Sequence, residues 1–501
     1  MPASWLSLRN SRDGFSDFAA CLRGSVTGLY VADARSGAPL FAVNGDDPLN
    51  PASNVKMIST ATALSLLGAD FRYPTRVIGA PPDAGVVHGD VYLLGSYDPT
   101  LNLGDLDELA AAVAARGVTR IDGRLVVGAD PTRDGIFRAI VPIEIRGGEP
   151  GQPAIATPPA GIDLIAPEVT ARTTGGRPRL TIKATPGVDA AGHPRVVVAI
   201  AGTIGHGATY TYPLAVHDRT ALAAYALGAA LRRHGVAIGG DFRVLELPAF
   251  LGAAGAAGIL PIELARHDSP RLADIIARVN KWSINWLADR VIITAAALAS
   301  RSAPSMDGAL SAMYDWLEHR PGIAKAELVV DTGSGLSYKT QITARELESV
   351  VRAAAGFAGK PEDVDPAAAR AWVDSLAVAG TDGTLGRRFR GSCARGKLHA
   401  KTGTLSTAIA LSGVLDVDPE RPLAFSIITN TDAPLAPRYV RGAHEQLVGL
   451  LCGYLDRTRR AGTPALVAAA PPPTAAAATD LADLEELGPD PALDDETAAA
   501  P

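Results

Sequence analysis

The chain has 501 residues, of which 47% are hydrophobic and 20% are charged. Such a composition can bury a large core and excludes a chain that is disordered throughout, and the length corresponds to about three domains of roughly 150 residues. The net charge is −6, but eight acidic residues and no Lys or Arg follow Arg460. The rest of the chain is therefore nearly neutral and lacks the basic face that nucleic-acid binding requires.

Two short β-rich runs open the organised part of the chain. Residues 27–33 and 39–43 are joined by a turn with a Ser-Gly pair, which predicts a β-hairpin. A helix is predicted next, from about Ser53 to Leu67, and Gly68 ends it. Its residues are apolar nearly all round, which is typical of a helix at the centre of a domain. A serine and a lysine at the start of such a helix need an explanation.

The texture of the sequence changes between about Tyr73 and Leu260. Short alternating runs and glycine-rich turns surround one predicted helix at 217–234, and we interpret the segment as one or two inserted β-rich domains. Residues 269–317 are predicted to be helical, with a break at 281–285.

Three β-rich runs lie between Lys397 and Asn430, and their short connections predict an antiparallel meander. A closing helix is predicted at 438–457. The Ala-, Pro- and acid-rich residues beyond Thr463 cannot build a core and are predicted to be disordered.

Three cysteines, Cys21, Cys393 and Cys452, have no metal-binding spacing and cannot form a disulfide framework. One bridge with a free thiol, or three buried thiols, both stay open. No apolar stretch reaches the roughly 18 residues of a transmembrane helix, so no membrane-spanning segment is expected.

Ser53 and Lys56 are the first candidate site pair. Residues three apart on a helix share a face, so the lysine amine can reach the serine hydroxyl. A serine hydroxyl is a poor nucleophile without a base, and a lysine can be that base when burial or a neighbouring cation lowers its pKa. The spacing alone is weak evidence, but no other serine of this chain has a lysine three residues on.

Two further motifs follow. Ser283-Ile-Asn285 falls in the break between two predicted helices, and Lys401-Thr-Gly403 ends a predicted strand, where glycine allows close approach to a ligand. Each alone is typical of an ordinary loop or strand end. Together and in this order, the three motifs match the Ser-x-x-Lys, Ser-x-Asn and Lys-Thr-Gly set of penicillin-recognising acyl-serine enzymes.

More narrowly, the chain resembles the low-molecular-mass class C penicillin-binding proteins, which are D-alanyl-D-alanine carboxypeptidases and endopeptidases of peptidase family S13. The resemblance runs from about Gly28 to Leu455. The stretches that carry it are residues 51–56, 67–73, 95–101, 333–337, 379–385 and 400–405.

The resemblance implies an α/β (α+β) fold. A β-lactamase/transpeptidase-like domain, with an antiparallel sheet flanked by helices, would carry inserted β-rich domains between the first and second motifs. The predicted division is a catalytic domain at 1–72 and 263–462, inserted domain II at 73–160 and 215–262, inserted domain III at 161–214, and a disordered tail at 463–501.

The resemblance also implies a function. The chain would be a serine-type D-Ala-D-Ala carboxypeptidase that cleaves peptidoglycan stem peptides through an acyl-serine intermediate, with β-lactams as covalent inhibitors. DD-endopeptidase activity, a β-lactamase or esterase of the same fold, and a non-catalytic peptidoglycan-binding scaffold remain alternatives. No cofactor or metal is expected, and the oligomeric state is not predicted.

The expected catalytic residues are Ser53, Lys56, Ser283, Asn285 and Lys401. The resemblance implies that Ser53 attacks, Lys56 accepts its proton and Lys401 supplies positive potential. Ser283 and Asn285 would relay the proton and hold the substrate amide. The expected substrate-binding residues are Thr402, Gly403 and Thr404.

Two segments depart from the family pattern. Tyr338 stands where relatives often have an arginine, and residues 148–154 replace a Pro-Gly-Trp segment. Both regions help relatives to bind the stem-peptide side chain, so altered or relaxed side-chain specificity is expected. Because the substrate lies outside the cytoplasmic membrane, we expect a periplasmic protein. Met1–Arg9 carries no export signal, which would then have been removed or lie upstream.

Overall fold

The computed structural model describes residues 24–129, 140–160, 162–190, 194–216, 219–240, 242–246, 261–359, 364–434 and 436–461. The tail predicted to be disordered, the N-terminal residues and Cys21 lie outside these ranges. We call residues 24–72 and 269–461 the main module and residues 73–268 the insertion. None of the helices in the described ranges is both long and apolar enough to cross a membrane.

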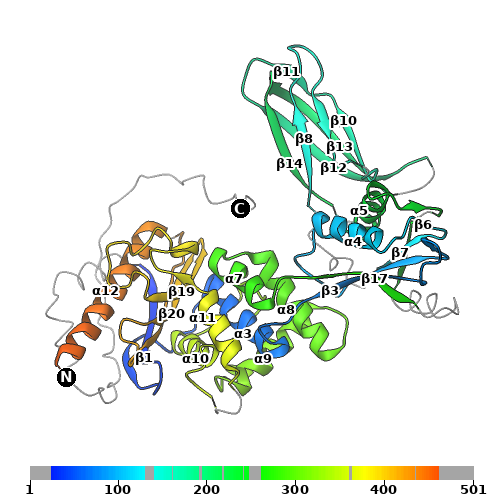
Figure 1. Ribbon diagram of the computed structural model, residues 1–501. Helices are drawn as coiled ribbons and strands as arrows, with labels where there is room; N and C mark the ends of the chain where they lie inside the picture. The colour runs from blue at the N-terminus through cyan, green and yellow to red at the C-terminus, as the bar shows by residue number, and fades with distance from the viewer. Residues whose placement is uncertain are drawn as a thin grey trace. The chain divides into compact units, whose positions relative to one another are not determined.

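A six-stranded antiparallel sheet forms the base of the main module, with strand order β18-β19-β20-β21-β1-β2 (Figure 1). Its strands are β1 (Val26–Asp33), β2 (Pro39–Val43), β18 (Ala377–Val378), β19 (Leu398–Leu405), β20 (Ala408–Leu415) and β21 (Leu423–Asn430). The predicted hairpin and meander are both confirmed, and β1 joins them by pairing with β21. The two-residue edge strand β18 is too short to show a sequence period.

Seven helices of the described main module pack on this sheet and on one another. They are α3 (Val55–Leu67), α7 (Leu272–Trp282), α8 (Asn285–Ser300), α9 (Met306–His319), α10 (Ala344–Ala354), α11 (Pro366–Ser375) and α12 (Pro437–Ala461). Helix α3 contacts α7, α8, α9, α10 and α11 (Figure 1). Because α3 is buried continuously from Val55 to Leu64, its predicted central position is confirmed.

Both faces of the sheet are covered, which explains why all eight residues of β20 are buried. Alternate residues of β20 enter different cores because side chains alternate across a strand. Ala410 and Val414 pack in the core that contains α3, whereas Leu411 and Leu415 pack against α12.

The break between α8 and α9 was not predicted. Helix α8 ends at Ser300, and Arg301 has a left-handed conformation with φ of 54°. Helix α9 begins after Ser305, whose side chain accepts a hydrogen bond from the Gly308 amide. A serine N-cap of this kind is a local signal for a helix start.

The described part of the insertion contains four sheets and the helices α4 (Leu103–Ala115) and α5 (Arg219–Arg233). One sheet has the order β16-β7-β5-β3-β17 and another β15-β6-β4; two more have the orders β10-β13-β11, with β12 also on β13, and β14-β8-β9. The strands are β3 (Pro74–Gly79), β4 (Val86–Val87), β5 (Val91–Leu94), β6 (Arg120–Ile121), β7 (Leu125–Ala129), β8 (Ile140–Arg146), β9 (Ile155–Thr157), β10 (Ile165–Val169), β11 (Arg172–Thr174), β12 (Arg179–Val188), β13 (Pro194–Gly205), β14 (Thr209–Ala215), β15 (Ala237–Ile238), β16 (Phe242–Glu246) and β17 (Ile262–Asp268).

Strand pairing relates these sheets to the predicted domain boundaries. Strand β14 pairs with β8, so the pairing joins strands from both sides of the predicted boundary at residue 160. Strand β17 pairs antiparallel with β3, so the chain enters and leaves the insertion on neighbouring strands. The domain boundaries themselves stay a prediction.

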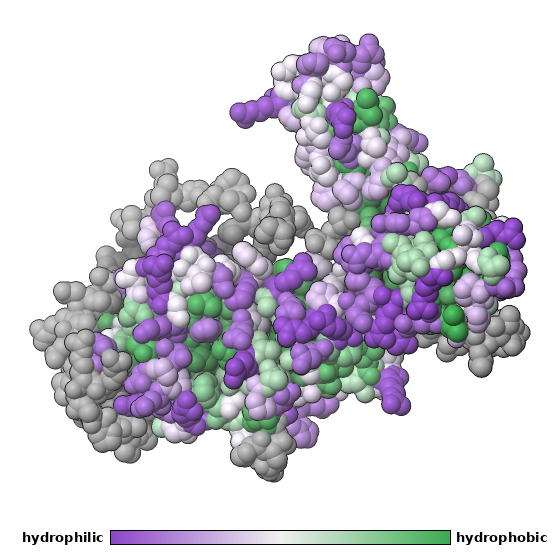
Figure 2. Space-filling view, viewed as in Figure 1, coloured by the Kyte–Doolittle hydropathy of each residue, from purple (hydrophilic) through white to green (hydrophobic). Residues whose placement is uncertain are grey.

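The surface is mixed in character. Hydrophilic residues are spread over the face seen in Figure 2, with hydrophobic residues between them. The large hydrophobic residues that are exposed include Trp282, Trp286, Leu336 and Tyr338, which all lie close in sequence to motif residues.

Candidate active site

Ser53 lies in a short 3₁₀ turn, η1 (Ala52–Asn54), directly before α3. Ala52 has a φ of 49°, in the left-handed region that a residue with a side chain rarely adopts. Two glycines pack against this turn: a Cβ on Gly335 would lie 2.1 Å from the Ala52 carbonyl oxygen, and one on Gly403 2.5 Å from that of Pro51. The surrounding loops therefore hold the serine in a constrained backbone at the head of a buried helix.

Lys56 is fully buried in the first turn of α3. Its Nζ lies 3.0 Å from Ser53 Oγ, 2.6 Å from Asn285 Oδ1 and 2.7 Å from the Ser334 carbonyl oxygen. A neutral lysine amine has two hydrogens and one lone pair. Asn285 and Ser334 can accept the two hydrogens, which leaves the lone pair for the hydroxyl of Ser53.

A second pair lies beside the first. Ser283 ends α7 in a left-handed conformation, with φ of 58°, and Asn285 is the first residue of α8. Nζ of Lys401, which is buried on β19, donates to Ser283 Oγ at 2.8 Å and to the Thr402 carbonyl oxygen at 2.8 Å. Since Asn285 contacts Lys56 and Ser283 contacts Lys401, the loop between α7 and α8 brings all five expected catalytic residues into one group.

The strand β19 presents two threonines at this group. Thr402 Oγ1 donates to Thr384 Oγ1 at 2.9 Å, and Arg441 Nη2 on α12 donates to Thr404 Oγ1 at 3.1 Å. Burial lowers the pKa of Arg441, and the charge of Arg388 lowers it further. Lys401 and Arg441 therefore bring two cationic side chains to one strand.

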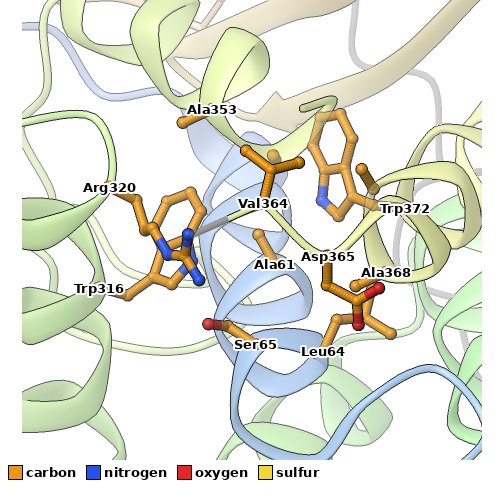
Figure 3. A pocket seen from close by; sticks show the side chains of 12 residues that line it. Ala61, Leu64, Ser65, Trp316, Arg320, Ala353, Val364, Asp365, Ala368 and Trp372 are labelled. Carbon is orange, nitrogen blue, oxygen red and sulfur yellow. The ribbon is translucent and has the colours of Figure 1, made fainter. Parts of the chain in front are cut away.

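A cavity of about 50 Å³ lies elsewhere, beside the C-terminal half of α3. Figure 3 shows Trp316 and Arg320 on one side of α3 and Trp372 with Asp365 on the other. Ser65 lines this cavity, twelve residues after Ser53, or about 18 Å along a helix at 1.5 Å per residue. The cavity is therefore separate from the group around Ser53.

The comparison with family models is decisive. The model of the D-Ala-D-Ala carboxypeptidase 3 (S13) family matches residues 16–133 and 139–451. The chain belongs to the S13 family. Its resemblance to the penicillin-binding proteins, predicted from the motifs, is confirmed.

Individual relatives agree with this assignment. The chain is 32% identical over 463 residues to a D-alanyl-D-alanine carboxypeptidase from Actinomadura sp. (strain R39), with 84% of this chain and 81% of the relative covered. It is 28% identical to carboxypeptidase DacB from Mycolicibacterium smegmatis, with 82% of this chain and 77% of the relative covered.

Among solved structures, penicillin-binding protein 4 from Haemophilus influenzae, complexed with a β-lactam, has a similar fold. The TM-score is 0.67 at 21% identity, and the match covers 87% of this chain and 98% of that chain. The predicted α/β fold of the β-lactamase/transpeptidase type is thereby confirmed.

Three residues of this S13 chain had no expected part in the site. Ser334 supplies a carbonyl oxygen to Lys56. Asp289 lies one helical turn after Asn285 on α8 and interacts with Ser334; burial raises the pKa of its carboxyl, while the Ser334 hydrogen bond and the Lys56 charge oppose the rise. The spacing of four residues from Asn285 could have indicated Asp289. No signal in the sequence indicates Arg441.

Tyr338 lies four residues after Ser334 and is exposed. Its hydroxyl lies 2.7 Å from Ser406 Oγ in the turn between β19 and β20. The loop that contains Ser334 is thereby joined to the end of the strand that carries Thr402 and Thr404.

Proposed function

We propose that this protein is a serine D-Ala-D-Ala carboxypeptidase that cleaves peptidoglycan stem peptides and is acylated by β-lactams. Membership of the S13 family and the likeness to the carboxypeptidase from Actinomadura support the proposal. The observation that carries it is the 3.0 Å contact between Lys56 Nζ and Ser53 Oγ at the head of a buried helix.

In the proposed acylation step, Ser53 Oγ attacks the carbonyl carbon between the two D-alanines. Lys56 takes the hydroxyl proton, since its amine is held by Asn285 and Ser334 with Ser53 in reach. A base requires the neutral amine, and the full burial of Lys56 favours that form.

Collapse of the tetrahedral intermediate breaks the peptide bond and leaves an ester on Ser53. The proton that Lys56 took passes through Ser283, whose hydroxyl Lys401 holds in place, to the departing D-alanine nitrogen. Water then hydrolyses the ester and frees Ser53. The backbone N–H groups of Ser53 and Thr404 are the proposed oxyanion hole, usually the largest electrostatic contribution to such a reaction.

The substrate carboxylate is proposed to bind at β19. Lys401 supplies positive potential there, the hydroxyls of Thr402 and Thr404 are hydrogen-bond donors, and Arg441 adds a second cation at Thr404.

The exposed edge of β19 offers a place for the peptide itself. Strand β18 pairs with β19 only at His399 and Ala400, so β19 beyond Ala400 has no strand partner on that side among the described residues. A peptide can add there as a further strand, and Gly403 lets β19 pack closely on the serine turn.

Export and side-chain specificity complete the proposal. Because the proposed substrate lies outside the cytoplasmic membrane, the enzyme is proposed to be periplasmic. Tyr338 in place of an arginine removes a cation from the rim of the site, which favours stem-peptide side chains without a free carboxylate at that position.

Covalent labelling tests the proposal. Intact-protein mass is measured after incubation with benzylpenicillin for the wild type, Ser53→Ala and the control Ser65→Ala, which changes an exposed serine on α3. We expect one penicilloyl adduct on the wild type and on Ser65→Ala, and none on Ser53→Ala. An adduct on Ser53→Ala would refute the assignment of the nucleophile.

Substrate assays then separate the alternatives. Release of D-alanine from a pentapeptide ending in D-Ala-D-Ala supports the carboxypeptidase, and cleavage of a cross-linked dimer adds endopeptidase activity. Rapid penicillin hydrolysis without D-alanine release would identify a β-lactamase instead. Stable labelling without any peptide cleavage would identify a binding scaffold.

A further inference from the structure

A group of metal-ligating side chains lies in the insertion, apart from the serine site. Asp105 and Glu108 are one turn apart on α4, so they share a helix face, and His267 comes from β17, which packs against α4. One ligand atom from each of the three residues lies within 4.8 Å of the others. His267 Nε2 is 3.8 Å from Asp105 Oδ2, and its Nδ1 is 4.0 Å from Glu108 Oε2.

A fourth carboxylate makes this group more than a surface cluster. Asp98 is only 1% exposed. Its Oδ1 accepts hydrogen bonds from the amide and the hydroxyl of Thr100, but its Oδ2 is buried with no hydrogen-bond partner among the described residues. The charged groups with which it interacts include His267 and Asp105, two members of the group.

The charges do not balance within the group. Asp98, Asp105 and Glu108 are three carboxylates, and His267 is the one member that can carry a positive charge. An unpaired buried carboxylate is costly unless a cation or a proton compensates it. A divalent cation bound by Asp105, Glu108 and His267 would supply a positive charge to compensate the Asp98 carboxylate, which interacts electrostatically with His267 and Asp105.

We propose that Asp105, Glu108 and His267 bind a divalent transition-metal ion of the Zn²⁺ type, with Asp98 as a buried carboxylate outside the ligand set whose charge the ion offsets. One imidazole nitrogen with carboxylate oxygens suits Zn²⁺, whereas Mg²⁺ and Ca²⁺ prefer oxygen ligands alone.

Small movements suffice to form the site. Ligand atoms around a tetrahedral Zn²⁺ at 2.0–2.1 Å lie about 3.4 Å apart, so the three donors must close by roughly an ångström. The side chain of Glu108 is 77% exposed and can move freely, while those of His267 and Asp105 are held at 15% and 18% exposure. The ion would tie α4 to β17, the strand that leads through residues 269–271 into α7 and the Ser283 loop.

Metal titration of the tag-free full chain, stripped with a chelator, tests the site. Isothermal titration with ZnCl₂ is compared for the wild type, Glu108→Gln, His267→Gln and the control His234→Gln. His234 lies 3.2 Å from Asp107, which is on α4 like Asp105 and Glu108. Arg233 already pairs with the Asp107 carboxylate. We expect one Zn²⁺ per wild-type chain, at least about tenfold weaker binding in both site variants, and no change in the control.

Two further measurements distinguish this site from a thiol site and from an oxygen-only site. The Co²⁺ absorption spectrum should lack thiolate charge transfer, since Cys393 is an exposed thiol that could bind metal on its own. MgCl₂ and CaCl₂ should give no comparable heat.

Because Glu108 is exposed, its variant should keep the fold even if His267→Gln does not. Wild-type Zn²⁺ affinity in Glu108→Gln, or no binding by the folded wild type, would overturn the proposal.

Discussion

The two halves of the molecule bury very different interiors. In the described insertion, the buried polar residues are Thr75, Asp98, Thr173 and Thr220, set in a core of Val, Leu, Ile and Ala. The main module buries many more, among them Lys56, Lys401, Asn280, Glu348 and His444.

Buried polar groups must find partners, and in the main module they form chains of hydrogen bonds. Asn54 Nδ2 donates to Ser412 Oγ, which donates to Ser426 Oγ; Asn280 Nδ2 donates to Thr60 Oγ1 and to Ser375 Oγ. A purely apolar interior would be simpler to stabilise. The difference therefore indicates that the interior of the main module serves catalysis, whereas the interior of the insertion serves packing.

Replacing Lys56 by methionine should have the largest effect. The side chain keeps its volume but loses the proposed base, and general-base catalysis contributes roughly 10²–10⁴-fold. We expect acylation by benzylpenicillin to slow by about that factor, measured by stopped-flow mixing and intact mass. Lys339→Met, at an exposed lysine of the nearby loop, is the control and should acylate at the wild-type rate. Equal rates in the two variants would separate Lys56 from the chemistry.

Cavities in the two cores should have different consequences. Leu227→Ala in α5 and Leu287→Ala in α8 each remove a fully buried side chain and should cost about 2–5 kcal/mol of unfolding free energy. We expect only Leu287→Ala to slow acylation at temperatures where both variants are folded.

The tryptophans help to assign these losses. Four of the five tryptophans lie in the main module and none lies in residues 73–268, so the change in tryptophan fluorescence on unfolding reports mainly the main module, and hydrogen exchange reports the insertion. If Leu227→Ala slowed acylation as much as Leu287→Ala, the insertion would have to be coupled to the chemistry.

Glu348 should make the main module less stable as pH rises. Its side chain is buried, and burial raises its pKa to about 8, above the value of 4.5 that it has when unfolded. The native state therefore holds a proton that the unfolded state releases, and stability falls between pH 4.5 and 8. Glu348 alone should contribute a loss of about 2–3 kcal/mol between pH 5 and 7, at 1.36 kcal/mol per pH unit. Denaturant unfolding followed by tryptophan fluorescence should show stability falling between pH 6.5 and 8 in the wild type but not in Glu348→Gln.

His444 should act in the opposite direction with a smaller effect. It is fully buried on α12 with Nε2 2.9 Å from Thr429 Oγ1, and burial lowers its pKa to about 3. The unfolded chain takes up a proton below pH 6.5 that the native chain excludes, so stability falls on acidification. The loss between pH 6.5 and 5 should be about 2 kcal/mol.

The two opposing slopes overlap between pH 4.5 and 6.5, where they should largely cancel in the wild type. Single variants should therefore expose one slope each: Glu348→Gln should become acid-sensitive, and His444→Gln should lose stability as pH rises. Parallel profiles for the two variants would show that neither group titrates as described.

The sequence was most informative where chemistry or periodicity is local. The serine and lysine spacing, the glycine that ends α3 and the apolar character of that helix all depend on neighbouring residues. The Ser334 carbonyl and Arg441 reach the site only through tertiary packing. Every residue has a backbone carbonyl oxygen, so the residue type at 334 does not reveal this role. The pairing of β14 with β8, whose paired residues are roughly 70 positions apart, is likewise set by long-range contacts that a local pattern does not contain.

The strands that lead into and out of the insertion lie against each other. Beyond the β3–β17 pair, the Ser269 amide donates to the Tyr73 carbonyl oxygen at 3.0 Å, and the Tyr73 amide donates to Ser269 Oγ at 2.9 Å. The two ends of the insertion, at Tyr73 and Ser269, are therefore about one strand spacing apart, near 5 Å. A turn of a few residues could connect them directly. Closing so short a loop costs little entropy. An ancestor or an engineered enzyme without the insertion could thus keep the backbone of the main module unchanged. A different domain could likewise replace the insertion between Tyr73 and Ser269.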